Sequence, residues 1–291
     1  MDLPDIGLVT QARGYIANVR MQDWGGYVGM AILGYLQGVG LLTLLPGHMN
    51  FIVFLVTVAC YLGFSFSVNN CFDHEGDKLG AKVSLNPVAS GRISMGGGVI
   101  FSILLALAGL AVTSLWFGGT AFTIYAIMLL LSGMYSVPPF RLKAVPVLDM
   151  ASHGLFFGSL IVLYGVIVSR GFNAFTLPLL LSVYNLSLIL ELRNQLDDIE
   201  EDTATSVVTT VVKMGYRRAH NLFYGLLAMH MVILVNILNL LGNTALTAGA
   251  VVFFVGVAAY FFKKPDRGRF LLLMERITPL VYGLFVLSLL I

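Results

Sequence analysis

This sequence has few charged residues and few cysteines. Asp, Glu, Lys and Arg make up only 11% of its 291 residues, whereas soluble domains carry about 25%. Hydrophobic residues account for 58% of the chain, and the mean hydropathy is +0.88. This composition excludes an ordinary soluble domain and predicts a protein that crosses a membrane several times. The two cysteines, Cys60 and Cys71, are too few for a metal site of their own and do not suggest an exported disulfide fold.

Nine apolar segments divide the chain, and each is near the length of about 20 residues that crosses a bilayer as a helix. They lack the alternation of polar and apolar residues that a barrel strand shows. We therefore expect an all-α membrane protein with nine transmembrane helices in one bundle around a central cavity. Residues 1–291 would form a single domain of two pseudo-repeated four-helix units plus a ninth helix. The expected spans are 24–45, 50–70, 94–117, 120–137, 147–169, 173–193, 219–241, 243–262 and 272–291.

Charged residues gather on one side of this predicted bundle. If nine helices alternate in direction, the long connections 71–93, 138–146, 194–218 and 263–271 all lie on the side of the N-terminus. That side holds every Lys and Arg except Arg170, and the acidic residues lie at or near it as well. Basic loops mark the cytoplasmic face of a cell membrane, so we expect the N-terminus inside and the C-terminus outside. Orientation does not explain why the acidic residues gather there, whereas a functional face does.

Two polar triplets stand out from the apolar background. Each consists of Asn, Asp and Asp at intervals of four residues, at the end of the second or the sixth apolar segment. The first triplet is Asn69, Asp73 and Asp77, and the second, 125 positions later, is Asn194, Asp198 and Asp202. Residues four apart share one face of a helix, and both segments end on the same side of the bundle. The sequence therefore predicts that the two carboxylate pairs converge across a cavity.

Carboxylates that converge in a low-dielectric site repel one another strongly. Mg²⁺ relieves this repulsion, because it takes oxygen ligands and is commonly held by one or two carboxylates plus substrate phosphates. We therefore expect two Mg²⁺ ions bridged by a diphosphate, which also attracts basic side chains. Each basic residue nearby, taken singly, is equally explained as a topology signal. The candidate diphosphate ligands are Arg20, Lys78, Lys82, Arg92, Arg141 and Lys143.

At these residues the chain resembles the UbiA-type intramembrane prenyltransferases. The two triplets are similar to the two aspartate-rich motifs of that family, and Ser-Gly-Arg-Ile-Ser at 90–94 is similar to the segment after the first motif. Residues 135–143 resemble the family's loop between helices 4 and 5, and the resemblance extends over the whole chain. One departure is Pro139, where the family often has a lysine. Arg141 or Lys143 then has to substitute if that charge is needed.

The resemblance implies a transferase of prenyl groups that uses an allylic isoprenyl diphosphate, Mg²⁺ and a lipophilic acceptor in the bilayer. We expect no nucleic acid partner. The motif loops would lie at 69–93 and 194–215, and Arg92 and Lys82 would contact the diphosphate. The implied metal ligands are Asn69, Asp73, Asp77, Asn194, Asp198 and Asp202.

Two further residues are candidates for the chemistry itself. The resemblance places Tyr135 near the reacting allylic carbon, where an aromatic face stabilises a carbocation. Glu191 lies one helical turn before the second triplet on the same stripe, so it is a candidate to take a proton from the acceptor. Glu191 is equally explained as a structural partner of Arg193 or Arg20. The candidate catalytic residues are thus Asp73, Asp198, Tyr135 and Glu191.

The sequence carries no polar signature for the acceptor. Residues 194–202 are closest to transferases of quinone-precursor rings, so we expect an aromatic quinone precursor, with a glyceryl-phosphate ether lipid as the alternative. A cation-coupled transporter also uses intramembrane acids and internal repeats, but its site lies near the midplane of the membrane. Here the acids cluster at one face. A CDP-alcohol phosphotransferase would carry one motif with closely spaced aspartates, which this chain lacks.

Overall fold

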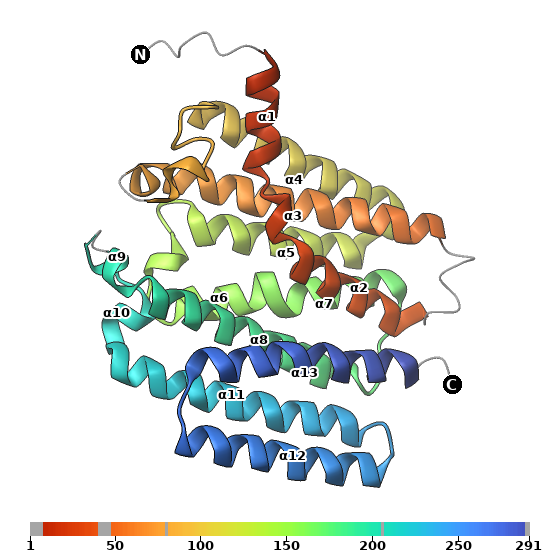
Figure 1. The fold of residues 1–291 in the computed structure, drawn as a ribbon. Coiled ribbons are helices and arrows are strands. Elements are labelled where there is room, and N and C mark those ends of the chain that lie inside the picture. The colour runs from red at the N-terminus through yellow and green to blue at the C-terminus, as the bar shows by residue number, and fades with distance from the viewer. Residues whose placement is uncertain (1–7, 40–47, 79–80, 205–206, 289–291) are drawn as a thin grey trace.

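A computed structural model gives the structure of this chain and describes residues 8–39, 48–78, 81–204 and 207–288. Within these ranges all the regular structure is helical, as the lack of strand alternation predicts. Eight of the helices described are long and apolar enough to cross a membrane. Figure 1 shows them stacked side by side in one bundle. The chain is therefore a multi-pass membrane protein.

The long helices follow the order of the predicted spans. The first expected span, 24–45, begins with α2 (Gly25–Val39), but residues 40–45 lie outside the described part of the chain. A ninth crossing therefore stays a prediction. The eight long spans are α3 (His48–Asp77), α4 (Met95–Phe117), α5 (Gly119–Ser136), α6 (Leu148–Gly154) continued by η4 (Leu155–Ser159) and α7 (Leu160–Ser169), α8 (Thr176–Asp197), α11 (Tyr216–Asn239), α12 (Thr244–Lys263) and α13 (Arg267–Ser288).

Short helices lie before the spans and in the long connections between them. In Figure 1, α9 and α10 lie at the end of the bundle opposite the C-terminus, and α3 runs toward that end. Because α9 follows α8 directly, the two motif-bearing helices α3 and α8 finish at the same face of the bundle. The short elements are α1 (Leu8–Asn18), η1 (Met21–Asp23), η2 (Ala81–Ser84), η3 (Leu142–Ala144), α9 (Ile199–Ala204) and α10 (Thr210–Met214).

Helix α2 packs against α7 through glycines. Gly34 and Gly38 are four residues apart on α2, and Gly165 of α7 meets this helix closely. A Cβ added at Gly34 would overlap the carbonyl of Val162, and one at Gly165 would lie 2.5 Å from the carbonyl oxygen of Ala31. Small residues let helix backbones approach each other, and this matters in lipid, where no hydrophobic force drives helices together. The glycines thus fix α2 against α7.

Buried hydroxyl groups link other helices. Thr57 of α3 and Tyr164 of α7 share a hydrogen bond of 2.8 Å, as do Ser182 of α8 and Tyr282 of α13. An unsatisfied polar group in hydrocarbon is costly, so such pairs fix how the helices are rotated about their axes. Two apolar clusters fill the space around these bonds, one among α3, α5 and α7 and one among α8, α11 and α13.

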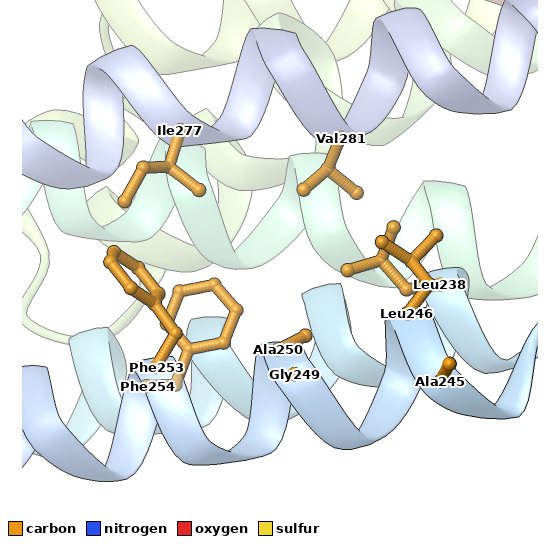
Figure 2. Close-up of a pocket in the computed structure, with 9 residues that line it drawn as sticks. All are labelled: Leu238, Ala245, Leu246, Gly249, Ala250, Phe253, Phe254, Ile277 and Val281. Carbon is orange, nitrogen blue, oxygen red and sulfur yellow. The ribbon is translucent and has the colours of Figure 1, made fainter.

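A hollow of about 330 Å³ lies between α11, α12 and α13 (Figure 2). Its lining is apolar and includes Leu238, Leu246, Phe254 and Val281. The hollow shares no residue with either motif and has no side chain that binds a charge. It is therefore not a diphosphate site, and the functional site has to be built at the motif end instead.

Replacing Gly34 by alanine tests the contact between α2 and α7. The added methyl group meets the Val162 carbonyl, and overpacking of this kind costs about 1–3 kcal/mol. We expect the midpoint of thermal unfolding in detergent to fall. Gly29→Ala on the same helix is the control, because an added Cβ there has no atom within 4 Å. Equal midpoints for the two variants would show that the close approach is absent.

Candidate active site

The first motif lies wholly on α3. This helix continues past the end of the apolar segment 50–70 to Asp77, so the predicted motif loop 69–93 is helical in its first part. The helix places all three motif residues on one face, and Asn69 Nδ2 donates to Ser136 Oγ of α5 at 3.2 Å. The motif is thereby fixed against the helix that carries Tyr135.

Asn86 holds the connection that follows the first motif. Its side chain is 2% exposed, and Nδ2 donates to Asp77 Oδ2 at 2.8 Å and to the Asn70 carbonyl at 2.9 Å. Its Oδ1 accepts from the amides of Val88 and Ala89 at 2.9 and 3.2 Å. One buried amide therefore folds the connection back onto the last aspartate of the motif.

The second motif crosses a break between two helices. Helix α8 ends one residue before Asp198, and α9 begins one residue after it. The backbone still joins residues four apart, because Asp198 N donates to Asn194 O and Asp202 N donates to Asp198 O, each at 2.9 Å. Asp202 also accepts from Thr209 Oγ1 at 3.3 Å. The predicted spacing is thus kept although the helix is interrupted.

Lys143 contacts the first motif. This residue lies on η3, and its Nζ forms an ion pair with Asp73 of the first motif. Burial lowers the pKa of Lys143 to about 8, while the carboxylates of Asp202 and Glu191 act to raise it. Lys143 is thus paired with the first motif, and carboxylates of α8 and α9 contribute to its electrostatic surroundings.

Arg141 lies beside the same carboxylate. Its guanidinium Nη2 is 3.8 Å from Asp73 Oδ1, and its Nε is buried with no acceptor among the described residues. A buried donor without a partner suits an anionic ligand. Of the two cations considered as substitutes for a lysine at Pro139, Lys143 is the one in close contact with the motif.

Two of the predicted cations bond to neighbours outside the motifs. Arg20 Nε donates to Asp23 at 2.7 Å, and its guanidinium lies 5.2 Å from the centre of the Phe66 ring. Lys78 Nζ donates to Glu75 at 2.9 Å on the exposed side of α3. The structure therefore does not bring these two side chains to Asp73 as it brings Lys143.

Two other predicted residues, Arg92 and Asn194, also bond to neighbours outside the ion pair of Lys143 with Asp73. Arg92 donates to Ser90 Oγ at 3.0 Å and to the Ser84 carbonyl at 2.9 Å, within its own connection. Asn194 is exposed and accepts from Arg193 at 3.1 Å. The side chain of Lys82 lies outside those that the structure describes.

Glu191 lies deeper in the bundle and is 8% exposed. Its Oε1 accepts from Tyr135 OH and from Gln195 Nε2, each at 3.1 Å, and its Oε2 is 3.6 Å from His153 Nε2. Neither arginine considered as its structural partner forms a hydrogen bond or ion pair with it among the described residues. The structure therefore joins Glu191 to Tyr135, the residue expected at the reacting carbon.

Aromatic rings surround Tyr135. The turn η4 is π-helical, and it places the Phe156 ring 5.0 Å from the Tyr135 ring and the Phe157 ring 4.5 Å from the Tyr27 ring. Tyr61 OH donates to the Phe156 carbonyl at 2.6 Å, which gives this carbonyl of the π-helical turn a partner. Ring faces of this kind stabilise a nearby positive charge.

Sequence reasoning missed the buried polar residues that hold the motifs in place. Asn70 and Gln195 each follow the first asparagine of a motif, and they are 3% and 4% exposed. Asn70 donates to Asn18 at 3.1 Å, and Gln195 donates to Asp149 at 3.0 Å. An amide at the same position of both triplets is a signal that the sequence does contain. Asp149 is fully buried, and only its place near the start of an apolar segment hints at this.

The donor set of the motifs suits Mg²⁺. Their side chains are aspartates and asparagines, which offer the hard oxygen ligands that this ion takes. Within the described residues, no three His, Cys, Asp or Glu side chains are grouped closely enough to hold a metal ion. Mg²⁺ keeps several waters and shares its ligands with substrate phosphates.

The fold and the paired motifs define a polytopic helical membrane protein with a polar site at the motif end of its bundle. Residues 28–274 match the UbiA prenyltransferase family, and the chain belongs to this family. Family membership opposes the alternative of a cation-coupled transporter and confirms the resemblance drawn from the motifs.

Relatives in sequence include plant and archaeal proteins. A probable homogentisate phytyltransferase 2 of chloroplasts from Oryza sativa subsp. japonica is 29% identical over 180 residues, which cover 60% of this chain and 47% of that protein. A lycopene elongase/hydratase from Halobacterium salinarum is 30% identical over 209 residues, which cover 69% of this chain and 70% of that protein. The chain thus spans about half the length of the rice relative.

Solved structures share the fold. A UbiA homolog from Archaeoglobus fulgidus bound to GPP and Mg²⁺ superposes with a TM-score of 0.72 at 18% identity, and the match covers 95% of this chain and 98% of the homolog. A digeranylgeranylglyceryl phosphate synthase structure gives a TM-score of 0.71 at 20% identity, with 96% and 98% covered. At these identities the likeness establishes the architecture.

Asn86→Ala tests how the first motif is held. The change removes the hydrogen bonds to Asp77, to the Asn70 carbonyl and to two loop amides, and a buried group left unpaired costs about 1–3 kcal/mol. We expect faster hydrogen exchange in residues 83–94, measured by mass spectrometry. Leu85→Ala is the control, because Leu85 is exposed in the same connection. Unchanged exchange in the Asn86 variant would show that this amide does not hold the loop.

Proposed function

We propose that this chain is a Mg²⁺-dependent prenyltransferase, which moves a prenyl group from an allylic isoprenyl diphosphate to a lipophilic acceptor in the membrane. The observation that carries the proposal is the ion pair of the partly buried Lys143 with Asp73 of the first motif, with Arg141 beside the same carboxylate. Oxygen ligands and cations thus gather at one place in an apolar bundle. The family and the GPP and Mg²⁺ held by the A. fulgidus homolog support the same reaction.

We propose the finer architecture on the same basis. Nine helices surround a central cavity, with two four-helix units that each contribute one motif and with residues 1–291 in one domain. The basic residues at the motif end support a cytoplasmic location for the N-terminus and both motifs. The C-terminus then lies outside the cell membrane.

The motifs would hold the leaving group. Two Mg²⁺ ions bridged by the diphosphate would neutralise the negative charge that develops as the allylic C–O bond breaks. Lys143 and Arg141 donate to the same diphosphate, Lys143 by exchanging its bond with Asp73 for one with phosphate oxygen. Basic residues at the rim complete the binding of the donor. The proposed metal ligands are Asn69, Asp73, Asp77, Asn194, Asp198 and Asp202, and the proposed rim residues are Arg20, Lys78, Lys82 and Arg92.

The aromatic residues and Glu191 would serve the transfer step. The rings of Tyr135 and Phe156 face the allylic carbon as it becomes positive and keep water away from it. The acceptor then forms its new bond to that carbon and loses a proton. Glu191 takes this proton on the carboxylate that Tyr135 holds in place.

We propose an aromatic quinone precursor as the acceptor. Two of the relatives, from Oryza sativa and Arabidopsis thaliana, are named for homogentisate, an aromatic acceptor. A third relative is named a lycopene elongase/hydratase, and one structural neighbour a digeranylgeranylglyceryl phosphate synthase. An assay with Mg²⁺, radiolabelled allylic diphosphates and three acceptors, namely an aromatic ring, a polyene and a glyceryl phosphate ether, separates these possibilities. If no donor releases diphosphate in a metal-dependent reaction, the proposal is wrong.

Alanine at Asp73 or Asp198 should nearly abolish turnover, because each change removes a carboxylate from one of the two motifs. The measurement is product formation at saturating Mg²⁺, with thermal unfolding as a check that the variant is folded. Glu200→Ala is the matched control, since Glu200 is exposed and lies between the aspartates of the second motif. Activity near wild type in either aspartate variant would contradict a site shared by both motifs.

Glu191→Gln should slow the transfer step. The amide oxygen still accepts from Tyr135, but the side chain no longer takes a proton, and loss of a general base lowers kcat by about 10²–10⁴-fold. The KM for the donor should stay near wild type. Glu275→Gln is the control, because Glu275 is a partly exposed glutamate paired with Arg193 at 3.5 Å. A wild-type kcat in the Glu191 variant would show that a group other than Glu191 takes the proton.

A further inference from the structure

Asp149 is a buried carboxylate that neither motif contains. It lies in the first turn of α6, is 0% exposed and accepts four hydrogen bonds. Its Oδ2 accepts from Thr210 N at 2.6 Å and Gln195 Nε2 at 3.0 Å, and its Oδ1 accepts from Met150 N at 2.7 Å and from Thr210 Oγ1. A buried carboxylate is costly unless it is fully bonded, and here both oxygens are occupied. Asp149 is therefore held as a fixed point of the structure.

One set of these bonds leads to the second motif. Thr210 is joined to Asp149 by both its amide and its hydroxyl group, and its neighbour Thr209 donates to Asp202 Oδ2 at 3.3 Å. Val147 N also donates to Thr210 Oγ1 at 2.6 Å. The position of residues 209–210, and with it the position of the last motif carboxylate, therefore depends on the start of α6.

A second set leads to Glu191. Gln195 Nε2 donates to Asp149 and also to Glu191 Oε1, at 3.0 and 3.1 Å. Gln195 Oε1 in turn accepts from Val211 N at 3.3 Å. Asp149 thus orients the Gln195 amide, which in turn orients Glu191. Both Gln195 and Glu191 lie on α8, the helix that leads into the second motif.

The backbone beside Asp149 is strained. Val147 has a φ of 75°, a conformation that is a genuine outlier for a β-branched residue. Such strain persists where the surrounding structure fixes it, and it clusters at functional sites. Here Thr210 accepts from the strained residue and donates to Asp149. The strained residue therefore lies where the start of α6 contacts Thr210, in the segment after the second motif.

We propose that Asp149 is a positioning residue, which sets Asp202 through Thr210 and Thr209 and sets Glu191 through Gln195. The proposal rests on the proposed function, because it assigns Asp202 to the metal and Glu191 to the proton. Asp149 itself touches neither substrate nor metal, since both its oxygens are bonded within the protein. Outer groups that orient metal ligands typically change metal affinity or activity by about 10–100-fold when they are replaced.

The test measures binding of inorganic pyrophosphate in the presence of Mg²⁺ by isothermal titration calorimetry, on the full chain in detergent. Asp149→Asn turns one acceptor into a donor that faces other donors, and we expect pyrophosphate affinity to fall by about 10–100-fold. Ser182→Ala is the control, since it removes a buried hydrogen bond to Tyr282 from the same helix α8, away from the motifs. It should lower thermal stability without changing pyrophosphate affinity.

Two milder variants keep the proposal testable if the Asp149 variant does not fold. Thr210→Val removes the hydroxyl donor to Asp149 and should weaken pyrophosphate binding in the same direction. Gln195→Met breaks the bond to Glu191 and should lower kcat with a smaller effect on the KM for the donor. Wild-type pyrophosphate affinity in Asp149→Asn, or in Thr210→Val where it alone folds, would overturn the proposal. Absence of Mg²⁺-dependent binding in the unmodified chain would instead overturn the proposed function.

Discussion

Carboxylates gathered at the end of an apolar bundle repel one another, and the arrangement of the site follows from how that repulsion is relieved. Lys143 supplies a positive charge to Asp73 and lies in the field of Asp202 and Glu191. Other carboxylates are bonded to neutral donors, as Asp77 is to Asn86 and Glu191 is to Tyr135. The protein therefore already contains a cation at the place where the proposed reaction needs one.

The two motifs solve the same problem with different supports. The first lies on an unbroken helix, and a buried amide from the following connection fixes its last aspartate. The second crosses a helix break, and its last aspartate is reached by Thr209 from a segment that the fully buried Asp149 holds. The first motif is also held by Ser136 and Lys143, whereas the second is held after its helix break by the segment that Asp149 bonds. This difference explains why α6 takes part in the second site.

The helical class, most of the spans and the two triplets were predictable from sequence, because apolar length and four-residue spacing are local properties. The end of α3 at Asp77 was not, since the apolar pattern that defines a span stops near residue 70 while the helix continues. The substitute for a lysine at Pro139 was also undecided, because the choice between Arg141 and Lys143 depends on how η3 turns toward Asp73. Asp149 acts through contacts with residues distant in sequence, and Asn86 acts through a loop that folds back onto α3. Spacing within the sequence does not reveal contacts of either kind. The count of nine helices stays a prediction, since α2 is described only as far as Val39.

The π-helical turn η4 has a consequence for the span that contains it. A π-helical turn accommodates one extra residue, and each residue of a helix turns it by about 100°. The part of the span before η4 presents Asp149 and His153 to α8, and the part after it presents Gly165 to α2. The added residue thus rotates the side chains after η4 about the helix axis relative to those before it. A single membrane crossing is thereby able to serve the polar site at one end and a close backbone contact at the other.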